Sequence, residues 1–184
     1  PYTWDKERVS SYIRYVDTDN QSHWLFDSFL FLEIMDTGTG GANKMFAKGY
    51  NLESANQADW TKLIDYYFQS ETGIGALDAS VKEASAILGT PRQKRQIVIS
   101  IPEPIVYQHP EQASSSTKYW GKIDNQTLDF SNSADRIKAC KWYIDQVRAK
   151  FNEKNYQHVE LAGFYWLAEK ATDTRDILNA VAIY

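Results

Sequence analysis

Three apolar runs constrain the fold of this chain more than any other feature. They read "FLFLEI" at residues 29–34, "QIVISIP" at 96–102 and "VELAGFYWL" at 159–167. Their residues are mostly apolar without regular polar alternation, which is typical of strands covered on both faces in a parallel sheet. We therefore expect three buried strands, the second of them ended by Pro102, whose backbone has no N–H to donate.

Helical patterns separate these runs. The clearest covers residues 134–154, where apolar side chains recur at spacings of three and four and form one face: Ile137, Cys140, Ile144, Val147 and Phe151. Shorter patterns predict helices within 5–16, at 60–68 after a possible Asp59 cap, at 77–88 and from Asp173 or Thr174 onward. Strands that alternate with helices predict right-handed crossovers and a parallel α/β sheet.

The composition narrows the classes of function. The 184 residues suit one domain, and a formal net charge of -4 offers no basic face to nucleic acid. No apolar run approaches the roughly 20 residues that span a bilayer. Cys140 is the single cysteine, so no intrachain disulfide can form. Six Trp and twelve Tyr are an unusual number, and they indicate either an aromatic core or rings that stack on sugars.

In parallel α/β sheets, ligands bind beyond the carboxyl ends of the strands. Glu33 and Asp36 follow the first run, and Asp36 is either a ligand contact or a turn residue that binds its own backbone. The glycines of "GTGG" at residues 38–41 do not have the spacing of a nucleotide-binding loop. Glu103 follows the second run between two prolines, either as a stiff ligand contact or as part of a rigid connector.

A long loop after the second run, residues 103–133, carries "YWG" and "DNQTLDF". Loops of this length in a compact domain are usually functional or disordered. These segments combine aromatic rings, acidic side chains and a glycine that lets a ligand approach the backbone closely. They could form a sugar-binding rim, with Trp120 as a stacking platform.

The third run ends on Tyr165 and Trp166, and Glu169 follows. We expect both rings at the rim of a cleft as sugar platforms. Glycoside hydrolysis uses two carboxyl groups, one of them a proton donor, and burial beside aromatic rings raises the pKa of a glutamate. Glu169 is thus our candidate general acid/base. The alternative is an exposed glutamate that caps the next turn.

Metal-ion and nucleophile chemistry is less well supported. His23, His109 and His158 form no metal-binding motif, and "DTDNQS" at 17–22 lacks the glycine and glutamate of a calcium loop. Cys140 falls on the apolar face of a predicted helix, and the chain contains no G-x-S-x-G sequence. We expect neither a metal ion nor a cofactor.

Four segments resemble one known family: "WLFDSFLFLE" at 24–33, "YWGKID" with "LDFS" at 119–131, "DRIKACKWYIDQV" at 135–147 and "VELAGFYWLAE" at 159–169. This is a bacterial family of TIM-barrel proteins that is labelled a domain of unknown function and described as glycoside-hydrolase-like. The resemblance implies that the three runs are strands two, three and four of eight. It also implies further strands before Pro1 and after Tyr184, and an extracellular or periplasmic location.

The resemblance also bears on Glu169. In a large clan of retaining glycosidases with this fold, the acid/base follows the fourth strand and the nucleophile follows the seventh. Glu169 corresponds to the first position. An asparagine precedes the acid/base in that clan, whereas Ala168 precedes Glu169 here.

Together these observations predict an α/β fold that is part of a (β/α)8 TIM-type barrel, with residues 1–184 as the N-terminal part of one domain. The predicted function is a carbohydrate-active protein, most simply a glycoside hydrolase that acts on an oligosaccharide or polysaccharide. Glu169 is the predicted catalytic residue, and the predicted substrate contacts are Tyr165, Trp166, Trp120, Glu103, Glu33 and Asp36. The alternatives are a non-catalytic carbohydrate-binding or structural barrel and a small α/β enzyme complete in itself. We also expect such a unit to leave core surface exposed, because about eight strands are needed to close a barrel.

Overall fold

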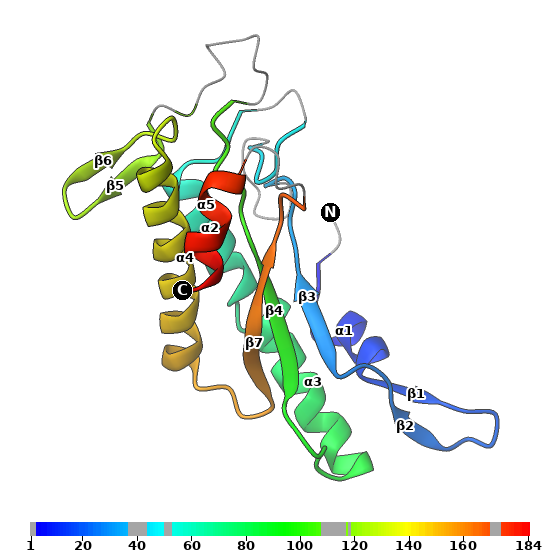
Figure 1. Cartoon of the computed structure of the whole chain (residues 1–184). Coiled ribbons are helices and arrows are strands. Elements are labelled where there is room, and N and C mark those ends of the chain that lie inside the picture. Colours follow the sequence, from blue (N-terminus) through cyan, green and yellow to red (C-terminus); the bar gives the residue numbers. More distant parts are fainter. Residues whose placement is uncertain (1–2, 37–43, 50–52, 108–116, 118, 170–173) are drawn as a thin grey trace.

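The computed structural model describes residues 3–36, 44–49, 53–107, 117, 119–169 and 174–184 (Figure 1). These residues form a mixed α/β fold with five helices and three small sheets. The helices are α1 (Lys6–Ile13), α2 (Gln57–Tyr67), α3 (Gly73–Leu88), α4 (Ser133–Lys154) and α5 (Arg175–Ala182). The strands are β1 (Arg14–Val16), β2 (Ser22–Trp24), β3 (Ser28–Phe31), β4 (Arg95–Ile101), β5 (Gly121–Ile123), β6 (Gln126–Leu128) and β7 (Val159–Trp166).

The central sheet has the order β3-β4-β7, and both of its strand pairs are parallel. This confirms the prediction of parallel strands from the three apolar runs. In the register, Phe31 lies opposite Ile99, and Ile99 lies opposite Phe164. The β4–β7 pairing shifts by one residue beyond Ile97, so that Ala162 of β7 has no partner on β4. β3 is shorter than predicted, because its pairing ends at Phe31.

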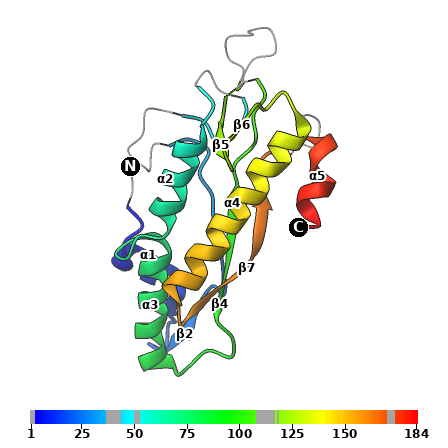
Figure 2. The ribbon, with the colours of Figure 1, turned by 90° about the vertical axis from the view of Figure 1, so that its left-hand side faces the viewer.

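Helices cover one face of this sheet, and among the described residues no helix covers the other face. Figure 2 shows α2 and α3 on one side of β4 and β7, with the long helix α4 running across the same face. Ile97 and Ile99 of β4 are fully buried in the core that these helices share. Leu30, which lies between Phe29 and Phe31 on β3, is 48% exposed. Apolar surface of β3 is therefore exposed.

The sheet is not closed. Within the described residues, no strand pairs with the outer edge of β3 or with the outer edge of β7. The other two sheets are antiparallel hairpins, β1–β2 and β5–β6, and neither extends the central one. No helix in the described part of the chain has the length and apolar character needed to cross a membrane.

The core between helices and sheet is rich in aromatic rings. Trp60 of α2 is fully buried and meets Trp120 edge to face, with ring centroids 5.0 Å apart. It also meets Tyr143 of α4 at 5.7 Å and Phe130 at 6.2 Å. Aromatic pairs in such arrangements add to the free energy gained from burial of their area. Much of the aromatic content is therefore structural, and it joins α2, α4 and the β5–β6 segment.

A capping box begins α2 three residues before Asp59, the cap expected from the sequence. The Asn56 Oδ1 accepts hydrogen bonds from the Ala58 N–H at 2.8 Å and the Asp59 N–H at 3.2 Å. The Asp59 Oδ2 accepts one in return from the Asn56 N–H at 2.9 Å. Asp59 thus closes the box from inside the helix. These bonds satisfy N–H groups that have no partner within the helix.

We expect Asn56→Ala to lower the free energy of unfolding by about 1 kcal/mol, because two N–H groups of the first turn lose their acceptor. Chemical denaturation monitored by circular dichroism measures this change. Asn152→Ala is the control, since Asn152 is exposed within α4 and caps nothing. Equal stability of the two variants would show that the cap contributes little.

Candidate functional site

A glutamate follows each strand of the central sheet. Glu33 comes after Phe31 at the end of β3, Glu103 after Ile101 at the end of β4, and Glu169 after Trp166 at the end of β7. Because the strands are parallel, these positions all lie toward the carboxyl edge of the sheet, at the top of Figure 1. This is the edge at which sheets of this type bind ligands.

Tyr165 and Glu169 form a direct pair at the end of β7. The Tyr165 hydroxyl donates a hydrogen bond to the Glu169 carboxylate. This bond, more than any burial, raises the pKa of Tyr165. Glu169 is exposed, so the desolvation that we expected at this side chain is not present in the structure.

The backbone of Glu169 has an unusual conformation for a residue with a side chain. Its φ is 50°, in the left-handed region that favours glycine. The Glu169 N–H donates to the Trp166 carbonyl at 3.2 Å and closes a tight turn directly after the strand. This turn brings the Glu169 carboxylate back over Tyr165. Backbone strain of this kind is concentrated at functional sites.

Trp166 lies away from this pair. β7 continues through Trp166, and successive side chains of a strand point to opposite faces of the sheet. Tyr165 lies opposite Ser100 and Trp166 opposite Ile101, and the Trp166 ring packs against the core with its Nε1 buried. The two rings therefore point to opposite faces of the sheet and do not lie side by side, as we had expected for the wall of a cleft.

Trp120 is also unavailable as a platform. It is 1% exposed, and its ring contacts Trp60, Phe130 and Trp142 at centroid distances of 5.0 to 5.5 Å. No face of the ring is open to a sugar in this structure. The neighbouring Tyr119 is 60% exposed instead.

Glu33 is a partly desolvated carboxyl group of this edge. It is half-buried, and burial raises its pKa. Its charge acts on Tyr66 and Tyr67 at the end of α2, whose pKa values are raised mainly by their own burial. Glu33 lines a largely apolar cavity of about 240 Å³ beside β3, together with Trp4, Tyr12, Tyr66, Tyr67 and apolar residues of β3 and α3.

Asp36 and Glu103 both bind the backbone of the segment 44–49. The buried Asp36 carboxylate accepts a hydrogen bond from the Lys44 N–H at 2.8 Å. The Glu103 carboxylate, 8% exposed, accepts one from the Lys48 N–H at 2.7 Å. Asp36 thus binds a residue eight positions further along the chain rather than its own neighbouring backbone, and the Glu103 carboxylate is buried rather than solvated. Both acids fix a loop beside the candidate site.

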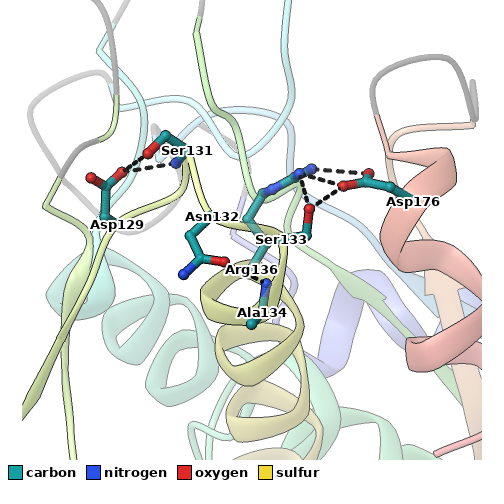
Figure 3. A network of polar contacts seen from close by, with 7 residues as sticks. All are labelled: Asp129, Ser131, Asn132, Ser133, Ala134, Arg136 and Asp176. Atoms are coloured by element: carbon teal, nitrogen blue, oxygen red, sulfur yellow. Dashed lines mark hydrogen bonds and ion pairs between the residues drawn. The ribbon is translucent and has the colours of Figure 1, made fainter.

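A polar network that the sequence did not predict joins α4 to α5 near the same edge (Figure 3). The Arg136 Nη2 binds the Asp176 carboxylate at 2.7 Å and the Ser133 Oγ at 3.1 Å. The Ser133 hydroxyl donates to the same carboxylate, and Asn132 caps α4 by accepting from the Ala134 N–H at 3.0 Å. The network holds the start of α5, which follows Glu169 along the chain.

The network predicts a pH-dependent contribution to stability. The hydrogen bond from Ser133, together with the Arg136 charge, lowers the pKa of Asp176. A carboxyl whose pKa is lower in the folded state stabilises the fold above its unfolded pKa, and that contribution is lost as the pH falls through the folded pKa. We therefore expect Asp176→Asn to be less stable than the parent at pH 7, and the difference to shrink between about pH 5 and pH 2.

Thermal denaturation across this pH range tests the expectation. Asp124→Asn is the control, because the Asp124 side chain is 86% exposed and lies 3.6 Å from Lys138. A stability difference between parent and Asp176→Asn that stays constant from pH 7 to pH 2 would contradict a charge-based role.

The structure also bears on metal-ion binding and on Cys140 as a nucleophile. Within the described residues, no three His, Cys, Asp or Glu side chains gather as a metal ion would require, and His109 lies outside those residues. Cys140 is fully buried in α4, and burial raises the pKa of its thiol to about 12. A thiol in that state is a poor nucleophile.

The fold and these contacts define a mixed α/β domain whose carboxyl edge carries acidic and tyrosine side chains. The chain belongs to the family described as Domain of unknown function (DUF4855), whose model matches residues 1–184. No curated protein and no solved structure matches the chain.

Proposed function

We propose that this protein is carbohydrate-active and acts as a glycoside hydrolase, with its site at the carboxyl edge of the central sheet. The observation that carries the proposal is that each of three parallel strands is followed by a glutamate at one edge, the last of them paired with a tyrosine. In α/β proteins with many different activities, ligands bind in the loops beyond this edge of the sheet.

We further propose that the sheet is part of a (β/α)8 barrel. Two features support this: helices cover only one face of the sheet, and no strand of the described residues pairs with its outer edges. In a closed barrel the face that carries Leu30 would become interior. The glutamates at the strand ends would then surround the mouth of the barrel, where barrel enzymes have their active sites.

In this proposal Glu169 is the general acid/base, and Tyr165 is its positioning residue. The hydroxyl bond from Tyr165 fixes the direction of the carboxyl group. A sugar bound over the pair would exclude water from Glu169, and desolvation favours the protonated form that a proton donor needs. A second carboxylate about 5 to 5.5 Å from Glu169 would favour retention of configuration, and about 6.5 to 9.5 Å would favour inversion.

The other acids have secondary roles in the proposal. Glu33, whose pKa burial already raises, is a substrate contact that can donate a hydrogen bond. Asp36 and Glu103 hold the segment 44–49 at the rim and thereby shape the site.

One observation favours a second candidate, a non-catalytic carbohydrate-binding protein. The cavity beside β3 combines Glu33 with the rings of Trp4 and Tyr12, which are 42% and 43% exposed. Exposed rings beside a hydrogen-bonding acid are what a sugar-binding surface requires, and they need no proton donor.

A panel of defined oligosaccharides separates the two candidates. The protein is incubated with each member, and both bond cleavage and binding are measured, by product analysis and by calorimetry. Cleavage of one linkage class supports the hydrolase. Saturable binding without cleavage supports the second candidate, and neither cleavage nor binding across the panel would refute both.

A further inference from the structure

A second cleft lies at the opposite edge of the central sheet, where the strands begin. It has a volume of about 690 Å³ and is open to solvent. Two segments line it: residues 24–27, which lead into β3, and residues 90–93 with Arg95, which lead from α3 into β4. In Figure 1 this amino edge is at the bottom, across the length of the strands from Glu33, Glu103 and Glu169. The cleft is therefore distinct from the site proposed above.

Arg95 is the unusual side chain of this cleft. It is the first residue of β4, and it is held there by a backbone hydrogen bond from its N–H to the His158 carbonyl at 2.9 Å. The residue is only 5% exposed, and its guanidinium lies over the Trp24 ring, 4.4 Å from the centroid. The Arg95 Nε is buried without a hydrogen-bond partner.

The guanidinium is also short of counter-charge. Asp27 acts on it electrostatically, yet among the described residues no carboxylate forms an ion pair with Arg95. Burial of a cation without a paired anion costs free energy, and here burial lowers the pKa of Arg95. Stacking on Trp24 offsets part of that cost, because the ring face attracts the cation. It leaves the buried Nε–H of the guanidinium without an acceptor.

The cleft supplies what a bound anion would need. An arginine presents a planar fork of donors that matches the oxygens of a carboxylate or a phosphate. Arg92 and Gln93 line the same cleft and add a second cation and an amide, and the exposed Asp27 adds one carboxylate, so that the two arginines leave the lining with a net positive charge. Leu25 and Phe26, which are 41% and 50% exposed, border it with apolar surface for the body of a small ligand.

We propose that this amino-edge cleft binds a small molecule that bears an oxyanion, a carboxylate or a phosphate, with Arg95 as its main contact. Arg92 is its second contact, at the rim. The inference does not depend on the proposed hydrolase activity, because it uses no residue of the carboxyl edge.

An NMR titration of protein labelled with ¹⁵N-arginine tests the proposal at the guanidinium itself. Inorganic phosphate and benzoate are added separately, at constant ionic strength set with chloride. We expect a saturable shift of the Arg95 Nε–Hε signal and a rise in the melting temperature. A response to phosphate alone identifies a phosphate site, a response to benzoate alone a carboxylate site with an apolar wall, and a response to both a general oxyanion site.

Three variants complete the test. Arg95→Gln should abolish the rise in melting temperature, Arg92→Gln should weaken binding roughly tenfold, and Arg175→Gln, an exposed residue at the start of α5, should change nothing. If Arg95→Gln does not fold, Arg95→Lys keeps the charge without the fork and should bind roughly tenfold more weakly. The proposal is overturned if neither anion shifts the Arg95 signal saturably, or if Arg95→Gln or Arg95→Lys responds as the parent does.

Discussion

Glu169→Gln should lower the turnover of a cleaved oligosaccharide by roughly 10²-fold or more, with little change in sugar binding. Glutamine has nearly the same shape as glutamate and can still contact the Tyr165 hydroxyl, but it cannot transfer a proton. Loss of turnover with retained affinity is the result expected when a general acid/base is removed. Initial rates and calorimetric binding of the same substrate measure the two effects separately.

Two further variants make this prediction specific. Glu160→Gln is the matched control, because Glu160 is an exposed glutamate on the same strand, bonded to Gln96 and away from the carboxyl edge. It should turn over substrate at the parent rate. Tyr165→Phe should give an intermediate loss of turnover, because it removes the hydrogen bond that fixes the direction of the Glu169 carboxylate. If Glu169→Gln hydrolyses substrate at the parent rate, Glu169 is only a turn residue after β7.

Trp60→Ala should lower the free energy of unfolding by about 3 to 5 kcal/mol. The Trp60 ring is fully buried and contacts three other rings, so its removal leaves a cavity between α2, α4 and the β5–β6 segment. A loss of this size is a large part of the stability of an ordinary domain. Urea denaturation followed by circular dichroism measures it.

The matched control is Trp4→Ala, the same substitution at a ring that is 42% exposed. It should cost much less, because water already reaches much of the Trp4 surface. Similar losses of unfolding free energy in both variants would contradict the expectation that burial of the Trp60 ring stabilises the core.

The parts of the fold predicted correctly depend on local patterns with strong physical signals. Mostly apolar runs predicted β4 and β7, since a strand that packs against helices tolerates few polar residues. The apolar face that includes Cys140 and Val147 predicted α4. The order of these elements then predicted parallel pairing, and parallel pairing places the glutamates at one edge.

The β5–β6 hairpin was missed, although a signal for it exists. It lies inside the stretch that the sequence indicated as a long loop. Its turn residues Asp124 and Asn125 both have positive φ, at 52° and 62°, and an Asp-Asn pair suits the tight turns that join antiparallel strands. This Asp-Asn pair indicates a hairpin whose first strand begins directly after Trp120. A ring beside a strand is a better candidate for the core than a ring in a long loop.

Other features have no local signal. Arg136 and Asp176 are 40 positions apart, and only the packing of α5 beside α4 brings them together. Tyr165 and Trp166 point to opposite faces of the sheet because β7 continues through Trp166, and side chains alternate between faces only within a strand. The sequence does not show at which residue the strand ends. The surroundings of Glu33 likewise depend on distant packing, because Tyr66 and Tyr67 of α2 line the same cavity.

The buried thiol of α4 can serve as a natural probe of local unfolding around this helix. A thiol reagent can reach Cys140 only when the face of α4 that buries it separates from the rest of the core. When reclosing is fast, the labelling rate is the rate for an exposed thiol multiplied by the fraction of molecules that are open. Because the chain has no second cysteine, mass spectrometry of the intact protein counts that reaction directly. The stability of the α4 core can thus be followed under native conditions, without denaturant and without an introduced label site.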